Sequence, residues 1–200
     1  MSCRYNNHFN INHYVCKNVH SLHMKRYFAT IILLSLGLTG FAQVKQTVTK
    51  SSVTFQIKNL GLNTTGSFGS LKADIQFDPA NPGTSSIIAS IDVNSINTDN
   101  DTRDEHLKSD SYFDAAKFPA ISMKLISLKH KSGNNYSGLF NLTIKDKTNV
   151  VEVPFSYTET GNSGEFKGGF KIKRTDYGVG GSSMIMSNDV TLTIDVVTSK

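Results

Sequence analysis

The densest polar cluster in the chain runs from Arg103 to His106 and could do chemistry in two ways. Arg103 could bind an anionic or carbonyl oxygen of a ligand head group, because a guanidinium makes charge-assisted hydrogen bonds to such oxygens. Alternatively, Arg103 could form a salt bridge with an aspartate that docks this segment on its neighbours. We favour the structural interpretation and expect further anchors of the same kind. The candidate portal or rim residues are Arg103, Asp104, His106, Arg174 and Asp176.

Neither a catalytic site nor a metal site is predicted. His106 and His130 are the only histidines after residue 42, and they lack the close spacing of zinc ligands. His106 next to a carboxylate could act as a general base, but no activated serine motif accompanies it. The aspartates that begin at Asp99 lack the glycine that a calcium-binding loop needs at its sixth position. We expect no catalytic residue, no metal and no cofactor other than a bound lipid.

The charges and cysteines are unevenly distributed along the chain. Residues 1–42 contain both cysteines, four basic residues and no acidic residue. Removing those four from the 21 basic residues leaves 17 against 16 acidic residues. A nearly neutral body has no broad electrostatic surface for nucleic acid, and without cysteine it forms no disulfide or thiolate metal site.

The first 42 residues have the pattern of a targeting signal. A basic start at Met24 precedes the apolar stretch Tyr27–Leu38, and small residues occupy the positions before a cleavage site after Ala42. This layout is typical of a secretory signal peptide and predicts a periplasmic or secreted protein. An uncleaved anchor is the alternative. The predicted division is a mis-assigned upstream extension at 1–23, a signal peptide at 24–42 and one domain at 43–200.

The rest of the chain alternates between apolar and polar residues, as strands with one buried face do. Val53, Phe55 and Ile57, for example, alternate with polar residues. Eight such runs predict an all-β fold, and we favour a closed antiparallel barrel over a sandwich because closure removes the exposed sheet edges. The runs are 53–58, 71–78, 87–94, 121–125, 136–144, 151–157, 166–172 and 190–196.

One segment, 99–119, interrupts this alternation and is rich in charge. It is too long for a hairpin loop, so we expect a short helix near Arg103–Ser109 and an irregular return that ends at Pro119. Its apolar residues should pack the insert against one end of the barrel. These are Leu107, Tyr112, Phe113 and Phe118.

The interior of an eight-stranded barrel holds either packed side chains or one small ligand. Glycines within strands leave space or allow sharp coiling, and this chain has several such glycines. They are Gly66, Gly69, Gly138, Gly168 and Gly169. If the interior is hollow, its natural ligand is a long apolar chain. The candidate ligand-binding residues are Phe55, Phe68, Ile91, Phe113, Met123, Phe140, Leu142, Phe155, Tyr157 and Phe170.

Several ordered motifs resemble those of the YceI-like family of periplasmic or secreted barrels. The most specific are Ile91-Asp92-Val93 through Thr98, Arg103 to Ser109, Tyr112-Phe113-Asp114 and Lys117-Phe118-Pro119. The resemblance implies a lipocalin/streptavidin-like barrel that binds a polyisoprenoid or another long-chain amphiphilic lipid. It implies at most transient membrane contact and leaves a homodimer open. A solid structural or stress-related interaction protein is the second hypothesis, and an enzyme on a lipid-like substrate is the third.

Overall fold

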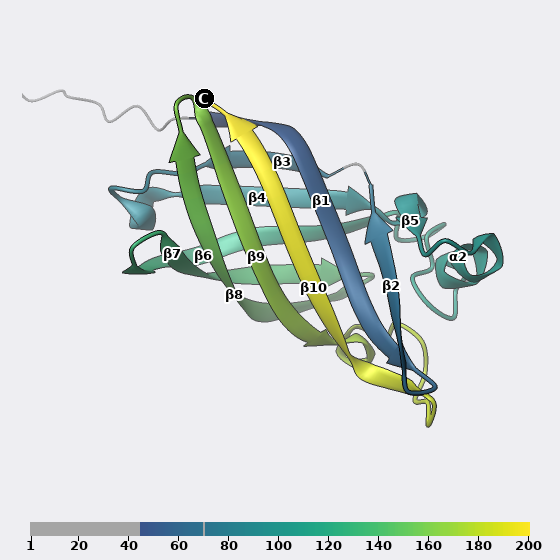
Figure 1. Ribbon diagram of the computed structural model, residues 1–200. Coiled ribbons are helices and arrows are strands. Elements are labelled where there is room, and N and C mark those ends of the chain that lie inside the picture. The colour runs from purple at the N-terminus through teal and green to yellow at the C-terminus, as the bar shows by residue number, and fades with distance from the viewer. Residues whose placement is uncertain (1–44, 70) are drawn as a thin grey trace, which may run out of the picture. The chain divides into compact units, whose positions relative to one another are not determined.

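The computed structural model describes residues 45–69 and 71–200, which form a β-barrel with one short α-helix (Figure 1). The predicted upstream extension at 1–23 and the signal peptide at 24–42 lie outside these described residues. The helix is α2 (Asp101–Lys108), and three 3₁₀ turns cover Pro82–Thr84, Val93–Ser95 and Arg174–Tyr177. The strands are β1 (Lys45–Asn59), β2 (Leu62–Phe68), β3 (Lys72–Gln76), β4 (Ser86–Asp92), β5 (Ile96–Asn97), β6 (Ala120–Ser132), β7 (Asn135–Ile144), β8 (Lys147–Thr160), β9 (Ser163–Lys173) and β10 (Met186–Ser199).

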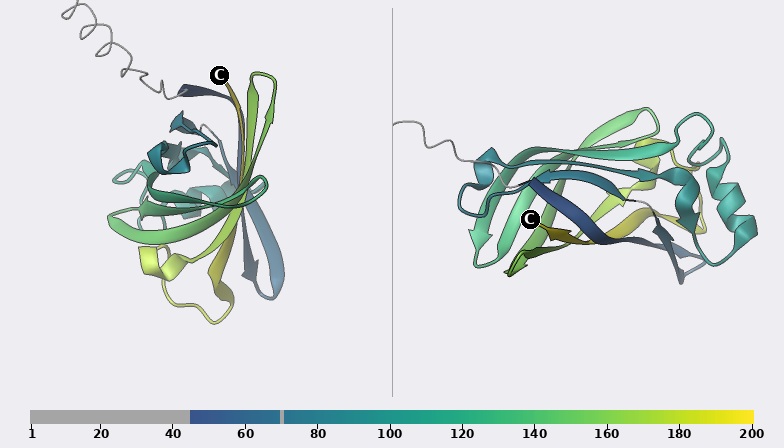
Figure 2. Two further views of the ribbon diagram at one scale, coloured as in Figure 1. Left: turned by 90° about the vertical axis from the view of Figure 1, so that its left-hand side faces the viewer. Right: turned by 90° about the horizontal axis from the view of Figure 1, so that it is seen from above.

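Eight of these strands form a closed antiparallel ring in the order β1, β10, β9, β8, β7, β6, β4 and β3. A long ladder between β1 and β10 closes the ring, from Thr47 opposite Ser199 to Asn59 opposite Met186. The ring strands are the eight predicted ones, so the eight-stranded barrel is confirmed. Figures 1 and 2 show the ring from three directions, with β1, β9 and β10 across its front in Figure 1.

Alternation did not predict the two short strands β2 and β5. The sequence of β2, LNTTGSF, is mostly polar, so its buried face is not visible as an apolar row. In the structure β2 pairs with the second half of β1, from Asn59 opposite Leu62 to Val53 opposite Phe68. β3 pairs with the beginning of β1. β2 and β3 therefore occupy successive parts of the same edge, and β5 pairs with β2 beyond the end of β4.

One end of the barrel is filled by aromatic rings packed around Phe77, which is 2% exposed. The Phe77 ring centroid lies 5.2 Å from that of Tyr136, 4.6 Å from that of Tyr157 and 5.2 Å from that of Phe166. Most of these contacts are tilted or edge-to-face, the arrangements that aromatic quadrupoles favour. We call this group the aromatic plug; its buried members are Ile75, Phe77, Leu128, Tyr136, Phe155, Tyr157, Phe166 and Val196.

A buried hydrogen-bond chain lies beside the plug. The Thr198 hydroxyl donates to Gln46 Oε1 at 2.6 Å, and Gln46 Nε2 donates to the Tyr157 hydroxyl at 3.5 Å. That hydroxyl in turn donates to Glu159, which also pairs with Lys200. Burial raises the pKa of Tyr157, whereas the Lys200 hydrogen bond lowers the pKa of Glu159. Because the buried polar groups of this hydrogen-bond chain have partners, this end of the barrel closes without a large desolvation cost.

The insert covers the opposite end of the barrel, as predicted. The expected helix near Arg103–Ser109 is α2, and the Asn100 side chain caps it by accepting a hydrogen bond from the Arg103 backbone N–H at 2.9 Å. The prediction for Phe118 was wrong: this residue is half-buried and lies outside the apolar clusters, with the Lys117 ammonium 5.1 Å from its ring centroid. The insert residues that pack against the core are Leu107, Tyr112 and Phe113.

The strand glycines do not leave empty space, which corrects one expectation from the sequence. A Cβ atom on Gly66 would lie 2.3 Å from the Phe55 ring, and one on Gly138 would lie 2.4 Å from the Phe140 ring. Side chains or backbone atoms also lie within 4 Å of a Cβ placed on each of Gly69, Gly168 and Gly169. These glycines therefore permit close packing, and of the five only Gly168 lines the free volume inside the barrel.

Replacing Gly164 by alanine should destabilise the barrel at its closed end. The added Cβ would lie 2.7 Å from the Tyr157 ring and 2.9 Å from Thr198 Oγ1, and both side chains are buried. Overpacking of this kind costs roughly 1–3 kcal/mol in the free energy of unfolding, which urea denaturation measures. Gly83→Ala is the matched control, because no atom lies within 4 Å of its added Cβ. Equal stability of the two variants would contradict this account of the plug.

Candidate functional site: an apolar cavity inside the barrel

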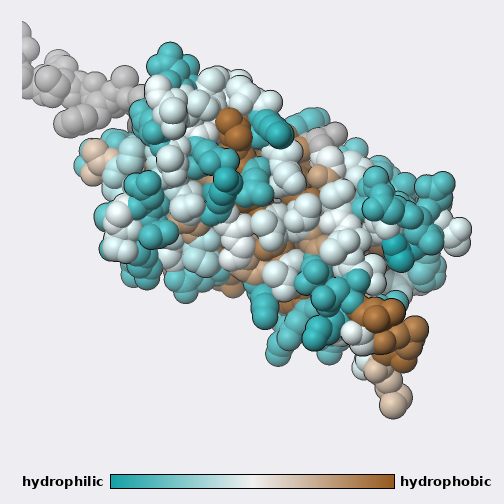
Figure 3. Space-filling view, viewed as in Figure 1, coloured by the Kyte–Doolittle hydropathy of each residue, from teal (hydrophilic) through white to brown (hydrophobic). Residues whose placement is uncertain are grey.

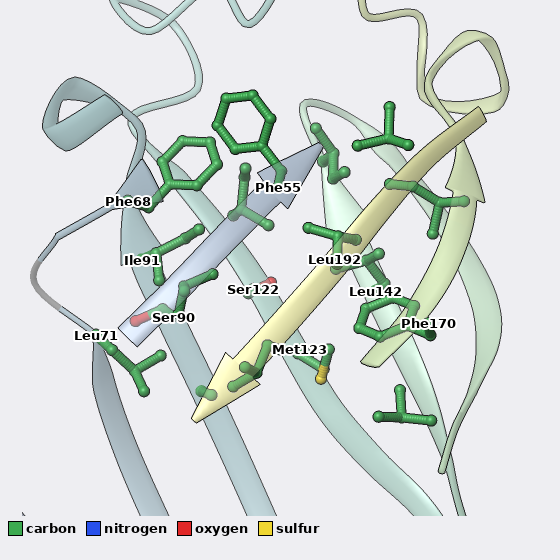
Figure 4. Close-up of a pocket in the computed structure, with 18 of the residues that line it drawn as sticks. Phe55, Phe68, Leu71, Ser90, Ile91, Ser122, Met123, Leu142, Phe170 and Leu192 are labelled. Atoms are coloured by element: carbon green, nitrogen blue, oxygen red, sulfur yellow. The ribbon is translucent and has the colours of Figure 1, made fainter. Parts of the chain in front are cut away.

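A cavity of about 260 Å³ lies inside the barrel, between the aromatic plug and the insert. All eight ring strands contribute side chains to its wall, and nearly all of these side chains are apolar. Figure 4 shows Phe55, Phe170, Leu192 and Met123 around the space. Beyond the plug the wall is lined mainly by aliphatic residues, together with aromatic rings such as those of Phe68, Phe140 and Phe170.

All but one of the predicted interior residues line the cavity. They are Phe55, Phe68, Ile91, Phe113, Met123, Phe140, Leu142, Phe155 and Phe170. The exception is Tyr157, which belongs to the aromatic plug. The prediction left out Val153, Leu192 and Ile194, which also line the cavity. Their places in the inward rows of β8 and β10 were the signal that could have found them.

The insert and β2 form the cover of the cavity. The Phe55 and Phe68 ring centroids lie 5.4 Å apart, and Phe68 meets Phe113 edge-to-face at 6.0 Å. Leu107 and Tyr112 complete this side of the lining. A backbone hydrogen bond of 3.1 Å from Gly180 N–H to the Ser111 carbonyl joins the insert to the loop before β10. The cover therefore consists of the insert and β2, which are far apart in the sequence, and the loop before β10 is bonded to the insert.

Thr98 joins the insert to the barrel rim. Its hydroxyl accepts a hydrogen bond from Arg103 Nε at 2.7 Å, and its backbone N–H donates to the buried Asp104 carboxylate at 3.0 Å. The Thr98 hydroxyl also donates to Asp104, and its carbonyl accepts from the Arg103 guanidinium. The expected Arg103–aspartate salt bridge is not among the ion pairs of the described residues. Arg103 and Asp104 are instead connected through Thr98, to which both side chains are hydrogen-bonded.

Arg103 keeps donor capacity toward the cavity. It belongs to the lining, and the hydrogen bonds of its guanidinium within the described residues come only from Nε and one terminal nitrogen. Asn59 also lines the cavity, and its Oδ1 atom is buried without a hydrogen-bond partner in the described part of the chain. A donor and an acceptor are therefore available on the wall of an otherwise apolar cavity.

Arg174 anchors the loop that precedes β10. The residue is 4% exposed, and each of its hydrogen bonds goes to an oxygen of that loop or of the start of β10. This arrangement occupies all five guanidinium donors. The segment 178–183 is therefore tied to a buried cation. The acceptors are the carbonyls of Val179, Gly181, Met186 and Ser187 and the side chain of Asn188.

The remaining candidate polar residues lie outside this arrangement. The His106 ring packs against Tyr112 with centroids 4.9 Å apart, and within the described residues it makes no hydrogen bond to a carboxylate. Asp176 is exposed, and its carbonyl accepts a 3.5 Å hydrogen bond from Asn149. In residues 45–69 and 71–200, no cluster of three or more His, Cys, Asp or Glu residues could hold a metal. The same residues contain no helix that is long and apolar enough to span a membrane.

Comparison with known proteins places this architecture in context. The sequence model of the YceI-like domain matches residues 45–198. A UPF0312 protein of Yersinia pestis is 30% identical over 183 residues, covering 84% of this chain and 95% of that protein. BcnA of Burkholderia cenocepacia has a TM-score of 0.72 at 28% identity, covering 76% of this chain and 98% of that one. A polyisoprenoid-binding domain from Saccharophagus degradans has the same fold, with a TM-score of 0.60 at 16% identity, covering 78% and 97% of the respective chains.

Thr98→Val should weaken the attachment of the insert. The substitution keeps the shape of the side chain but removes the acceptor for Arg103 and a donor to the buried carboxylate of Asp104. Leaving such groups without partners costs about 1–3 kcal/mol, which should appear in the free energy of unfolding. Thr193→Val, at an exposed position of β10, is the control and should change stability little. A loss no larger than that of the control would argue against Thr98 as the link.

Proposed function

The chain belongs to the YceI-like domain family, and on this basis we propose that it binds the tail of a long-chain amphiphile inside the barrel. The tail is of the polyisoprenoid class or a similar hydrocarbon. The single observation that supports this most directly is the cavity, whose wall is apolar on all eight strands. The bound lipid is the only non-protein group that the proposal requires.

The chemistry of the wall selects a hydrocarbon. Each methylene transferred from water into such a site contributes about 0.8 kcal/mol, before the costs of ordering and association. A polar ligand in the same place would lose its hydration without gaining hydrogen bonds, which costs several times as much per group. A chain of many carbons is therefore held well by a surface that offers almost no polar contact.

The size of the cavity limits how much of the ligand it encloses. Its volume of about 260 Å³ is just below the range of pockets that hold drug-sized ligands, which is roughly 300–1,000 Å³. The aromatic plug closes the opposite half of the barrel. The cavity therefore encloses only part of a long amphiphile.

The polar groups of the wall suit the head of such a ligand. The Arg103 guanidinium can donate to a carbonyl, hydroxyl or anionic oxygen, and the buried Asn59 Oδ1 can accept from a hydroxyl. Arg174 has no donor left to offer, and it supports the loop that precedes β10. Head-group contact in this proposal therefore falls to Arg103 and Asn59.

Two further observations agree with this function. The domain from Saccharophagus degradans, which has the same fold, is described as polyisoprenoid-binding. A shared fold does not determine the ligand, so this similarity supports lipid binding only together with the cavity in this chain. The basic, apolar and small-residue order at 24–42 supports export to the periplasm or the cell exterior, where a lipid carrier could exchange its ligand with a membrane.

Ala89→Phe should weaken lipid binding without unfolding the protein. Ala89 lines the cavity, so a phenylalanine there would occupy the volume of the ligand. We expect natively purified wild-type protein to release a long-chain lipid into organic extracts, detected by mass spectrometry. We also expect it to take up added polyprenol saturably in detergent micelles. Ala89→Phe should lower that affinity at least tenfold.

Ile88→Phe is the matched control for Ala89→Phe. Ile88 is the preceding residue of β4 and is 48% exposed, so an added ring there points away from the cavity. Its polyprenol affinity should equal that of the wild type, and circular dichroism should show both variants folded. Wild-type protein without extracted lipid and without saturable uptake would contradict the proposal, as would unchanged binding by a folded Ala89→Phe variant.

A further inference from the structure

Four large apolar side chains project from two neighbouring loops at one tip of the barrel. Leu60 in the β1–β2 turn and Leu62 at the start of β2 are 69% and 73% exposed, and Met184 and Ile185, which precede β10, are 105% and 57% exposed. A 2.8 Å hydrogen bond from the Leu60 backbone N–H to the Ile185 carbonyl holds the two loops together. Figure 3 shows the brown surface that they form at the lower right. We call these four residues the apolar tip.

The folding of the hairpin does not explain these residues. The β1–β2 turn has positive φ at both central positions, 52° at Leu60 and 78° at Gly61. Asparagine, aspartate and glycine adopt this conformation readily, whereas leucine does so rarely. The chain thus places a large apolar side chain both in an unfavourable conformation and in water. Neither arrangement contributes to the core, so the side chain has another use.

The apolar tip adjoins the end of the cavity that Asn59 and Met186 line, and we call this end the mouth. Asn59 and Met186 face each other in the β1–β10 ladder, and both line the cavity. Each is directly next to a tip residue in the chain, Leu60 after Asn59 and Ile185 before Met186. Thr64, two residues after Leu62, lines the cavity as well. The exposed apolar surface is therefore continuous along the chain with the inner wall.

The charges around the mouth indicate what the tip contacts. Exposed lysines at 58, 171 and 173 lie on the strands beside the tip, against two exposed acidic residues, Asp189 opposite Lys173 and Asp176 in the turn that follows Lys173. The insert at 99–119 has the opposite balance, with six acidic residues against three basic ones. An anionic lipid surface would attract the tip and repel the insert, which fixes the orientation of approach.

The area of the tip argues against a protein partner. Stable protein interfaces bury about 1,200–2,000 Å² in total with matched surfaces, and four side chains on two projecting loops are too few for that. Side chains that project in this way can instead enter the boundary between lipid head groups and acyl chains.

We propose that the apolar tip inserts into the surface of an anionic lipid bilayer and places the cavity mouth against the membrane. This inference rests on the proposed lipid-binding function and adds the surface through which the ligand is exchanged. With the tip inserted, an apolar tail passes between the acyl region and the cavity with little exposure to water.

The test is sedimentation of the full chain with vesicles of phosphatidylcholine, with and without phosphatidylglycerol. The wild type should bind the anionic vesicles, and added salt should weaken binding because it screens the lysines. Leu60→Asn with Met184→Ser should lower the bound fraction at least fivefold. Leu60→Asn alone should also raise the thermal midpoint, because asparagine before Gly61 suits this turn. Ile88→Thr with Val150→Thr is the control, since both residues are exposed elsewhere on the barrel, and it should bind as the wild type does.

Several outcomes would overturn the inference. They are absence of vesicle binding by the wild type, equal loss in the tip and control variants, and a wild-type dimer that dissociates in the tip variant. Polyprenol uptake in detergent micelles separates this inference from the proposed function. Tip variants that keep micellar uptake and lose vesicle binding support the inference. Wild-type vesicle binding without any polyprenol uptake would refute the proposed function and leave the tip as a membrane contact.

Discussion

The ladder between β1 and β10 is the interaction on which the rest of the structure depends. It joins the first and last strands of the domain, so the apolar rows of all eight strands face one shared interior. In an open sheet those rows would need a second layer, and the sheet would present two unpaired edges. Closure pairs the backbone N–H and C=O groups of both edges. It also creates an interior in which the size of the side chains determines how much space is filled.

The interior is divided unequally along its length. Aromatic rings around Phe77 fill one end, where a polar chain through Gln46 and Thr198 seals them. The other end is lined mainly by aliphatic residues and covered by the insert, and it retains the cavity. A single core thus combines a structural end with a binding end.

The sequence predicted the parts of this structure that depend on strand periodicity. Alternation identified all eight ring strands, because each has one wet face and one buried face. It missed β2, whose polar residues carry no apolar row. It also placed Tyr157 in the binding surface, because a period of two tells which face a residue occupies but not its height in the barrel. The hydrogen bonds of Thr98 could not be predicted either, because an alternating pattern contains no information on side-chain partners.

The central claim is that the apolar cavity at the insert end of the barrel accepts a hydrocarbon tail. The most direct test is a crystal structure of the protein loaded with a polyprenol. The account predicts continuous tail density between Leu192, Met123 and Phe170, with the rings around Phe77 in their present packing. Density for the lipid on the outer surface alone, with side chains collapsed into the interior, would contradict it.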